Sequence, residues 1–65
     1  MGSQDQLGKT IKKARKQAKL TQVEVAEKAG VHVNYYARIE RGEVNPSFEI
    51  LESIARALKT KFVVS

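Results

Sequence analysis

Apolar residues recur at intervals of three and four along four segments of the chain, and polar residues fill most positions between them. On an α-helix this spacing gathers the apolar side chains on one face, which can then pack against a core. We therefore predict helices at residues 5–18, 22–29, 33–40 and 48–58. The predicted core positions are Leu7, Ile11, Ala14 and Ala18, then Val25, Ala26 and Ala29, then Tyr36 and Ile39, and finally Phe48, Leu51, Ile54, Ala55 and Leu58.

Residues at the ends of the two central segments favour a tight turn between two helices. Thr21 and Glu24 have the spacing of a capping box, in which each side chain accepts a hydrogen bond from the other residue's amide. Gly30 suits the left-handed conformation that ends many helices, and Gly42 has the same place after the third segment. Two short helices joined by a turn with Gly, and with the small Ala26 at their contact, indicate a helix-turn-helix motif.

The last part of the chain carries two further signals. Ser47 has the position of an N-cap for the fourth helix. Residues 60–64 combine β-branched and aromatic side chains with alternating polarity, which predicts a short β-strand. This strand has no partner in its own chain, so it frays, packs as coil or pairs with another chain. The alternatives for residues 59–65 are therefore a dimerisation segment or the frayed end of a truncated domain.

Several motifs that lie in one register carry a resemblance to a known family. They are Q-x-x-x-A-x-x-x-G at 22–30 followed by V, R-I-E-R-G at 38–42, and N-P-S at 45–47. The chain resembles the lambda repressor/Cro class, the XRE-type transcription regulators, over most of its length, from about Leu7 to Leu58. The resemblance implies an all-α, lambda repressor-like helix-turn-helix bundle of four to five short helices. Tyr36 departs from the pattern, because the family usually has Ile or Val there, and this implies different local packing.

The resemblance also implies an ion pair between the first and third helices. In the family, an Arg at the position of Arg15 pairs with a Glu at the position of Glu40. We interpret Arg15 as a structural residue rather than a DNA contact. Breaking one partner of such a partly buried pair costs roughly 3 kcal/mol or more.

Composition and charge narrow the class of protein. At 65 residues with 42% hydrophobic residues and no cysteine, the chain fits one small domain of the cytoplasm, with a core over about 5–58. No apolar run approaches the roughly 20 residues that cross a membrane. The net charge is +5, and residues 1–20, with six bases and one acid, supply all of it. A basic first helix beside a helix-turn-helix motif indicates a polyanion-binding surface, whereas alone it would be equally consistent with a merely solvated face.

Three residues of the third helix are candidates for reading DNA bases. In the resembled class, the start of this helix faces the major groove. Val33, Asn34 and Arg38 lie opposite the predicted core positions Tyr36 and Ile39 at helical spacing. Arg38 can donate two hydrogen bonds to guanine, Asn34 can bridge adenine or bind a phosphate, and Val33 can contact a thymine methyl group.

A second group of residues is predicted to hold the DNA backbone. Gln22 stands at a helix start, where amides and the helix dipole suit a phosphate. His32 stands where the family prefers Ser or Thr, so it caps weakly or touches a phosphate, and Tyr35 is predicted to be the exposed tyrosine of the pair. The full set of predicted backbone contacts is Gln22, His32, Tyr35, Arg41, Asn45, Ser47, Lys12 and Lys16.

The sequence offers no basis for catalysis, a metal or a cofactor. One histidine without cysteine does not make a metal site. Glu24 and Glu40 are already assigned to a cap and an ion pair, and no nucleophile with a base or phosphate-binding glycine loop accompanies them. We therefore predict a protein that is not an enzyme.

The leading hypothesis is a sequence-specific binder of double-stranded DNA that represses transcription as a homodimer on a palindromic operator. One variant makes it an antitoxin that also binds a toxin, because some antitoxins of this type end in a short dimerising strand. A rival hypothesis is a protein-interaction adaptor with the same fold. A helix lying on a membrane surface is disfavoured, because the apolar residues of the first helix are needed for the core.

Overall fold

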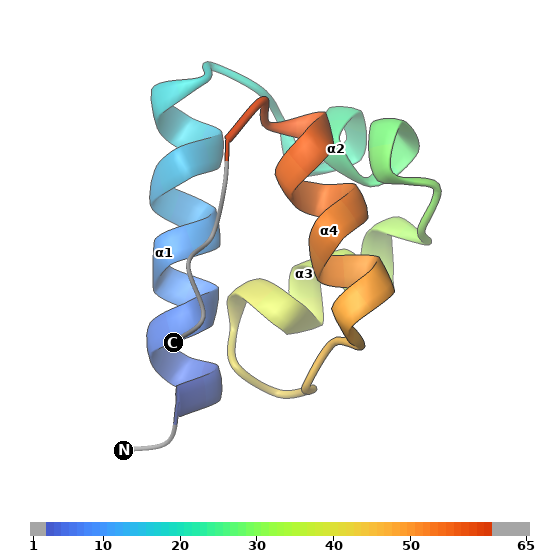
Figure 1. The fold of residues 1–65 in the computed structure, drawn as a ribbon. Coiled ribbons are helices and arrows are strands. Elements are labelled where there is room, and N and C mark those ends of the chain that lie inside the picture. The colour runs from blue at the N-terminus through green and yellow to red at the C-terminus, as the bar shows by residue number, and fades with distance from the viewer. Residues whose placement is uncertain (1–2, 61–65) are drawn as a thin grey trace.

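The computed structural model describes residues 3–60, which form four helices and no strand. Their bounds are α1 (Ser3–Gln17), α2 (Gln22–Ala29), α3 (Val33–Glu40) and α4 (Phe48–Ala57). Helix α1 stands along one side, while α2, α3 and α4 gather on the other (Figure 1). Helix α2 packs against both α3 and α4, and α1 packs against α3. Residues 61–65, which include most of the predicted strand, lie outside the described residues.

The predicted N-caps begin three of these helices. The Thr21 hydroxyl accepts from the Glu24 amide at 3.1 Å and the Glu24 carboxylate accepts from the Thr21 amide at 2.8 Å, which completes the capping box of α2. His32 Nδ1 accepts from the Asn34 amide at the start of α3. Ser47 Oγ accepts from the amide of residue 50 and begins α4. The Thr21 and Ser47 caps depend only on residues within one turn, which is why the sequence pattern located them, whereas the His32 cap was expected from the family resemblance.

All four helices end in the same way, with a residue in the left-handed conformation. These residues are Lys19, Gly30, Gly42 and Lys59, with φ angles of 60°, 74°, 75° and 53°. After α1, for example, the Lys19 amide donates to the Lys16 carbonyl and the Leu20 amide to the Arg15 carbonyl. This pair of bonds is the Schellman motif. Gly predicted two of the four, whereas a Lys in this conformation carries no signal in the sequence.

The core lies where the four helices meet. The buried apolar residues are Ile11, Val25, Ala26, Tyr36, Ile39, Leu51, Ile54 and Leu58, and each was a predicted core position. Leu7, Ala14 and Ala29 are half-buried at its edge, and Ala55 is also half-buried.

Two predicted core positions are wrong. Phe48 is 71% exposed, because it opens α4 one turn below Leu51, beyond the end of the core. Ala18 is exposed, because α1 ends at Gln17 and Ala18 already belongs to the turn that follows. Helical spacing alone assigns both residues to the apolar face and does not show where the opposing helices stop.

Helix α1 approaches the end of α3 closely because of Gly8. This residue is buried, and a Cβ built on it would lie 2.5 Å from the Glu40 carbonyl oxygen and 2.6 Å from that of Ile39. Any larger side chain would force the two helices apart. Gly8 therefore determines how closely α1 packs against α3, and the sequence pattern did not indicate this role.

Candidate nucleic-acid interface

One face of α3 carries polar residues that point away from the core. Asn34, Arg38 and Arg41 follow one another at intervals of four and three, and all three are exposed. The other face buries Tyr36 and Ile39. Because an α-helix repeats every 3.6 residues, the three polar residues form one row, which we call the outer stripe. It holds an amide and two guanidinium groups, the groups suited to base edges and phosphates.

A buried ionic network fixes α3 against the helices that precede it. Glu40 Oε2 accepts from Arg15 Nε at 2.7 Å, and Glu40 Oε1 accepts from Arg15 Nη2 at 3.2 Å and from Gln22 Nε2 at 3.0 Å. Arg15 Nη1 also donates to the Leu20 carbonyl at 3.0 Å. The pair expected between Arg15 and Glu40 is therefore present, and it joins α1 and the start of α2 to the end of α3.

The charges in this network are stabilised by their partners. Burial alone would raise the pKa of Glu40, but hydrogen bonds from Arg15 and Gln22 outweigh burial and hold that pKa below its ordinary value. The hydrogen bond to Glu40 likewise raises the pKa of Arg15. Both groups are thus charged at neutral pH, and the carboxylate accepts three hydrogen bonds although its side chain is only 2% exposed.

Gln22 therefore has a different main contact from the one expected. Its side chain is half-buried, and its amide nitrogen donates to Glu40. Its side chain makes no other hydrogen bond within residues 3–60.

Two apolar residues of α3 with predicted DNA contacts, Val33 and Tyr35, are only partly exposed. Val33 and Tyr35 are both half-buried and pack against the core cluster. Tyr35 is therefore the more exposed tyrosine of the pair, as expected, but it is half-buried against the core cluster rather than fully exposed. Tyr36 is fully buried, as expected, and burial raises the pKa of its phenol. The phenol oxygen makes no hydrogen bond to any of the residues described.

The remaining predicted backbone contacts lie at the ends of α3 and α4 or on α1. His32 and Ser47 are exposed and act as N-caps, and Asn45 is exposed in the loop between these helices. Lys12 and Lys16 are exposed on α1, and neither forms an ion pair within the described part of the chain. The predicted backbone contacts named here are therefore divided between the ends of α3 and α4 and the exposed side of α1.

Glu43, which the sequence pattern did not single out, contacts two residues of the outer stripe. Its Oε2 lies 2.6 Å from Arg41 Nε, and its Oε1 lies 3.4 Å from Arg38 Nε and 3.4 Å from Arg41 Nη2. The hydrogen bond from Arg41 lowers the pKa of Glu43, and the same bond raises the pKa of Arg41. The only available signal was an acid soon after two arginines, which by itself does not indicate a contact.

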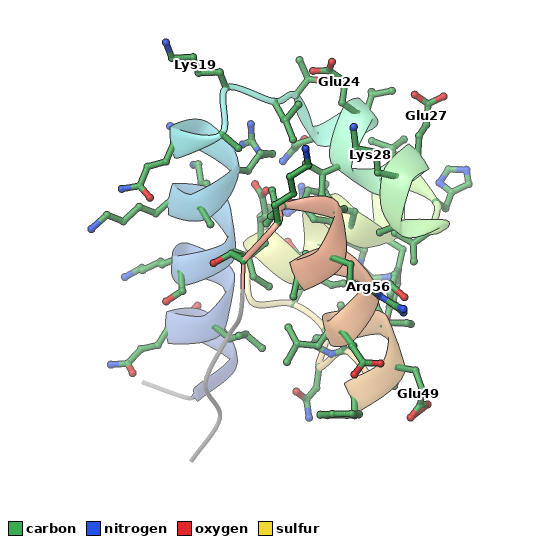
Figure 2. The ribbon with its side chains drawn as sticks, turned by 45° about the horizontal axis from the view of Figure 1, so that its top comes forward. Lys19, Glu24, Glu27, Lys28, Glu49 and Arg56 are labelled. Atoms are coloured by element: carbon green, nitrogen blue, oxygen red, sulfur yellow. The ribbon has the colours of Figure 1, made fainter. Side chains whose placement is uncertain are left out.

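Two features of residues 3–60 bear on metal binding and acid–base chemistry, namely the spacing of the titratable residues and a groove between α2 and α4. No group of three His, Asp or Glu residues lies close enough to hold a metal ion there. A shallow groove between α2 and α4 is lined by Lys28, Ala29, Ser53, Arg56, Ala57 and Lys59. Figure 2 shows Lys28 on α2 and Arg56 on α4. No carboxylate lines this groove, so it contains no acid–base pair. No helix among the described residues is long and apolar enough to cross a membrane.

Two short helices held by a buried ionic network, with a polar stripe on the second, define a helix-turn-helix domain. The family model described as Helix-turn-helix matches residues 11–64. The chain belongs to this family, and the XRE-type resemblance and the all-α fold are thereby confirmed.

Similar proteins include regulators from bacteria and a phage. The chain is 52% identical over 52 residues to the immunity repressor protein of Bacillus phage phi105, a match that covers 80% of this chain and 36% of the relative. It is 42% identical over 53 residues to the HTH-type transcriptional regulator SinR of Bacillus subtilis, covering 80% of this chain and 48% of SinR. It thus spans less than half the length of either relative.

A solved structure has the same fold. The restriction-modification controller protein C.AhdI from Aeromonas hydrophila superposes with a TM-score of 0.87 at 26% sequence identity. The match covers 89% of this chain and 88% of that one. The superposition therefore extends over nearly the whole of both chains.

Proposed function

We propose that this domain binds double-stranded DNA sequence-specifically and regulates transcription, most simply as a repressor. The outer stripe is the observation that carries the proposal. It presents Asn34 and Arg38 side by side on a short helix whose other face is locked into the core. Of the two relatives named above, the phage protein is a repressor and SinR is a transcriptional regulator, and both names support the same function.

In this proposal, Arg38 and Asn34 read base edges while α3 lies in the major groove. Arg38 donates to the O6 and N7 atoms of a guanine, and Asn34 pairs with an adenine or holds a phosphate. Val33 offers its remaining exposed surface to a thymine methyl group. Because the ionic network ties the end of α3 to α1 and α2, the helix enters the groove as a rigid element.

The second group of residues would position the domain on the phosphate backbone. The exposed members are His32, Asn45, Ser47 and Arg41, with Gln22 and Tyr35 contributing the parts that the core leaves accessible. Lys12 and Lys16 would add attraction to DNA of any sequence. Each neutralised phosphate makes binding more sensitive to salt.

We propose further that the DNA-binding form is a homodimer. A single helix in one groove contacts too few base pairs for useful specificity, and a two-fold pair would place two copies of α3 about 34 Å apart on a palindrome. Residues 60–64 have the composition of a pairing strand. Deletion of residues 62–65, followed by sedimentation analysis at micromolar concentration, tests this segment. A deleted chain as dimeric as its parent would contradict its role.

Selection of binding sites from a random duplex library tests the proposed function. We expect enrichment of one short motif, arranged as an inverted repeat. A library without any enriched sequence would contradict the proposal and favour the protein-interaction adaptor. The names of the relatives give no support to a toxin partner.

A further inference from the structure

The backbone after α3 fixes Glu43 beside the outer stripe. Gly42 adopts a left-handed conformation with φ of 75°, and the Glu43 amide then donates to the Arg38 carbonyl at 2.9 Å. Together with the bond from the Gly42 amide to the Ile39 carbonyl, it forms a Schellman motif. The backbone position of Glu43 is therefore set by main-chain hydrogen bonds and not by its side chain. The chain therefore turns back and holds a carboxylate next to two guanidinium groups that the proposed function uses.

Glu43 engages the two arginines in different ways. Arg41 donates from its Nε and Nη2 to the carboxylate, at 2.6 Å and 3.4 Å, so two of its three nitrogens are engaged. Arg38 approaches the carboxylate less closely, with its Nε 3.4 Å from Glu43 Oε1. Within residues 3–60, its terminal nitrogens make no hydrogen bond that would keep them from a base. The two terminal nitrogens of an arginine can donate together to the O6 and N7 atoms of guanine.

We propose that Glu43 is a positioning residue that sets the sequence discrimination of this domain. It keeps the Arg38 guanidinium nearby through the ion pair at Nε and leaves the terminal nitrogens to donate to a base. It weakens the attraction of Arg41 for phosphates by accepting hydrogen bonds from that side chain and by adding a negative charge nearby. The affinity for arbitrary sequences is thus lowered, because Arg41 attracts phosphates less strongly. The affinity for the correct base is retained, because the terminal nitrogens of Arg38 still donate to it. This inference rests on the proposed function.

The side chains of Arg38, Arg41 and Glu43 are exposed enough for DNA to compete with the contacts between them. The exposed fractions are 52% for Arg38, 57% for Arg41 and 46% for Glu43, so phosphates and bases can reach all three groups. Exposed ion pairs in water are individually weak and exchange readily. Glu43 therefore biases the arginines without locking them.

The test compares the wild-type chain with Glu43→Gln on two duplexes, the selected site and a scrambled duplex of the same composition. We expect Glu43→Gln to bind the scrambled duplex about two- to five-fold more tightly, in keeping with the loss of one exposed charge pair. The plot of log affinity against log salt should become steeper by about one unit on that duplex. The ratio of specific to non-specific affinity should fall. In Glu43→Gln/Arg41→Gln, the gain on the scrambled duplex should disappear.

Glu52→Gln is the matched control, because Glu52 is a 55% exposed acid that lies 4.0 Å from Arg56. It changes the net charge equally and should leave the affinity ratio unchanged. If Glu43→Gln left the ratio of specific to non-specific affinity unchanged, for example by an equal gain on both duplexes, the inference would be overturned and the proposed function would stand. A wild-type chain that fails to distinguish the duplexes would instead overturn the proposed function, and this inference with it. Thermal melting of each variant verifies that it is folded.

Discussion

Gly8 of α1 lies against Glu40 of α3 so closely that a Cβ on Gly8 would be 2.5 Å from the Glu40 carbonyl oxygen. The backbone of Glu40 thus supports α1, while its side chain binds Arg15 of the same helix. One residue at the end of α3 therefore determines both the distance and the orientation of α1. We therefore expect a substitution of Gly8 to lower the free energy of unfolding, which is the opposite of its usual effect in a helix.

Gly8→Ala should destabilise the domain, although Ala is favoured over Gly in a free helix by about 1 kcal/mol. The added methyl group must push against backbone atoms, and such overpacking costs typically 1–3 kcal/mol. Urea unfolding measures the effect. Lys9→Ala, on the exposed face of the same helix, is the control and should change the free energy of unfolding by less than about 0.5 kcal/mol. A Gly8→Ala variant more stable than wild type would show that the helices are not in close contact.

Leu51→Ala and Phe48→Ala should differ strongly, although both residues belong to α4 and follow the same helical spacing. Leu51 is buried, so its truncation should cost about 2–5 kcal/mol, a large share of the stability of a small domain. Phe48 is 71% exposed, and its truncation should cost less than about 0.5 kcal/mol. Thermal melts of the two variants decide the matter. Equal losses of stability would place Phe48 in the core after all.

Lys19→Gly should stabilise the protein, because Lys19 holds a left-handed conformation that costs an ordinary residue about 1 kcal/mol. Its side chain extends into solvent beyond the end of α1, so no contact is lost with it (Figure 2). Lys13→Gly, in the middle of α1, should do the opposite and cost about 1 kcal/mol. Two variants that lose the same stability would contradict the conformation assigned to Lys19.

Acid should destabilise the domain through Glu40. Its pKa in the folded chain lies below the ordinary value of 4.5, so the ionised carboxylate stabilises the fold above that pH. This stabilisation is lost as the pH falls through the lower, folded pKa. Glu24 and Glu43 have lowered pKa values as well and add to the acid sensitivity.

Unfolding of wild type and Glu40→Gln at a series of pH values from 7 to 3 isolates the contribution of Glu40. At neutral pH the variant should be clearly less stable, because Arg15 keeps its buried charge without a carboxylate partner. The difference between the two proteins should narrow below the ordinary pKa of 4.5. A constant difference across the range would mean that the Glu40 charge does not contribute to folding.

Much of the fold follows from short-range patterns in the sequence. The capping box of Thr21 and Glu24 and the glycines after α2 and α3 gave helix bounds that agree with the structure to within two residues. These features depend on neighbours within one or two turns, so they are visible in a single sequence. The Arg15–Glu40 pair came from the family resemblance and not from spacing.

The features that the sequence did not predict depend on contacts between distant segments. The exposure of Phe48 depends on where the other helices end, and the role of Gly8 depends on how closely α3 approaches. The contacts of Glu43 depend on the turn at Gly42. Lys19 takes a conformation usually given to Gly, because the surrounding hydrogen bonds impose it. None of these conditions is contained in local periodicity.

The central claim is that the outer stripe reads DNA sequence, and binding of Arg38→Ala and Lys16→Ala to systematically varied operator duplexes tests it most directly. Arg38→Ala should lose about 1–3 kcal/mol on the selected site and relax the preference at one base position. Lys16→Ala should weaken binding to all sequences about equally and flatten the dependence on salt. The claim would be contradicted if Arg38→Ala kept the full sequence preference while Lys16→Ala altered it.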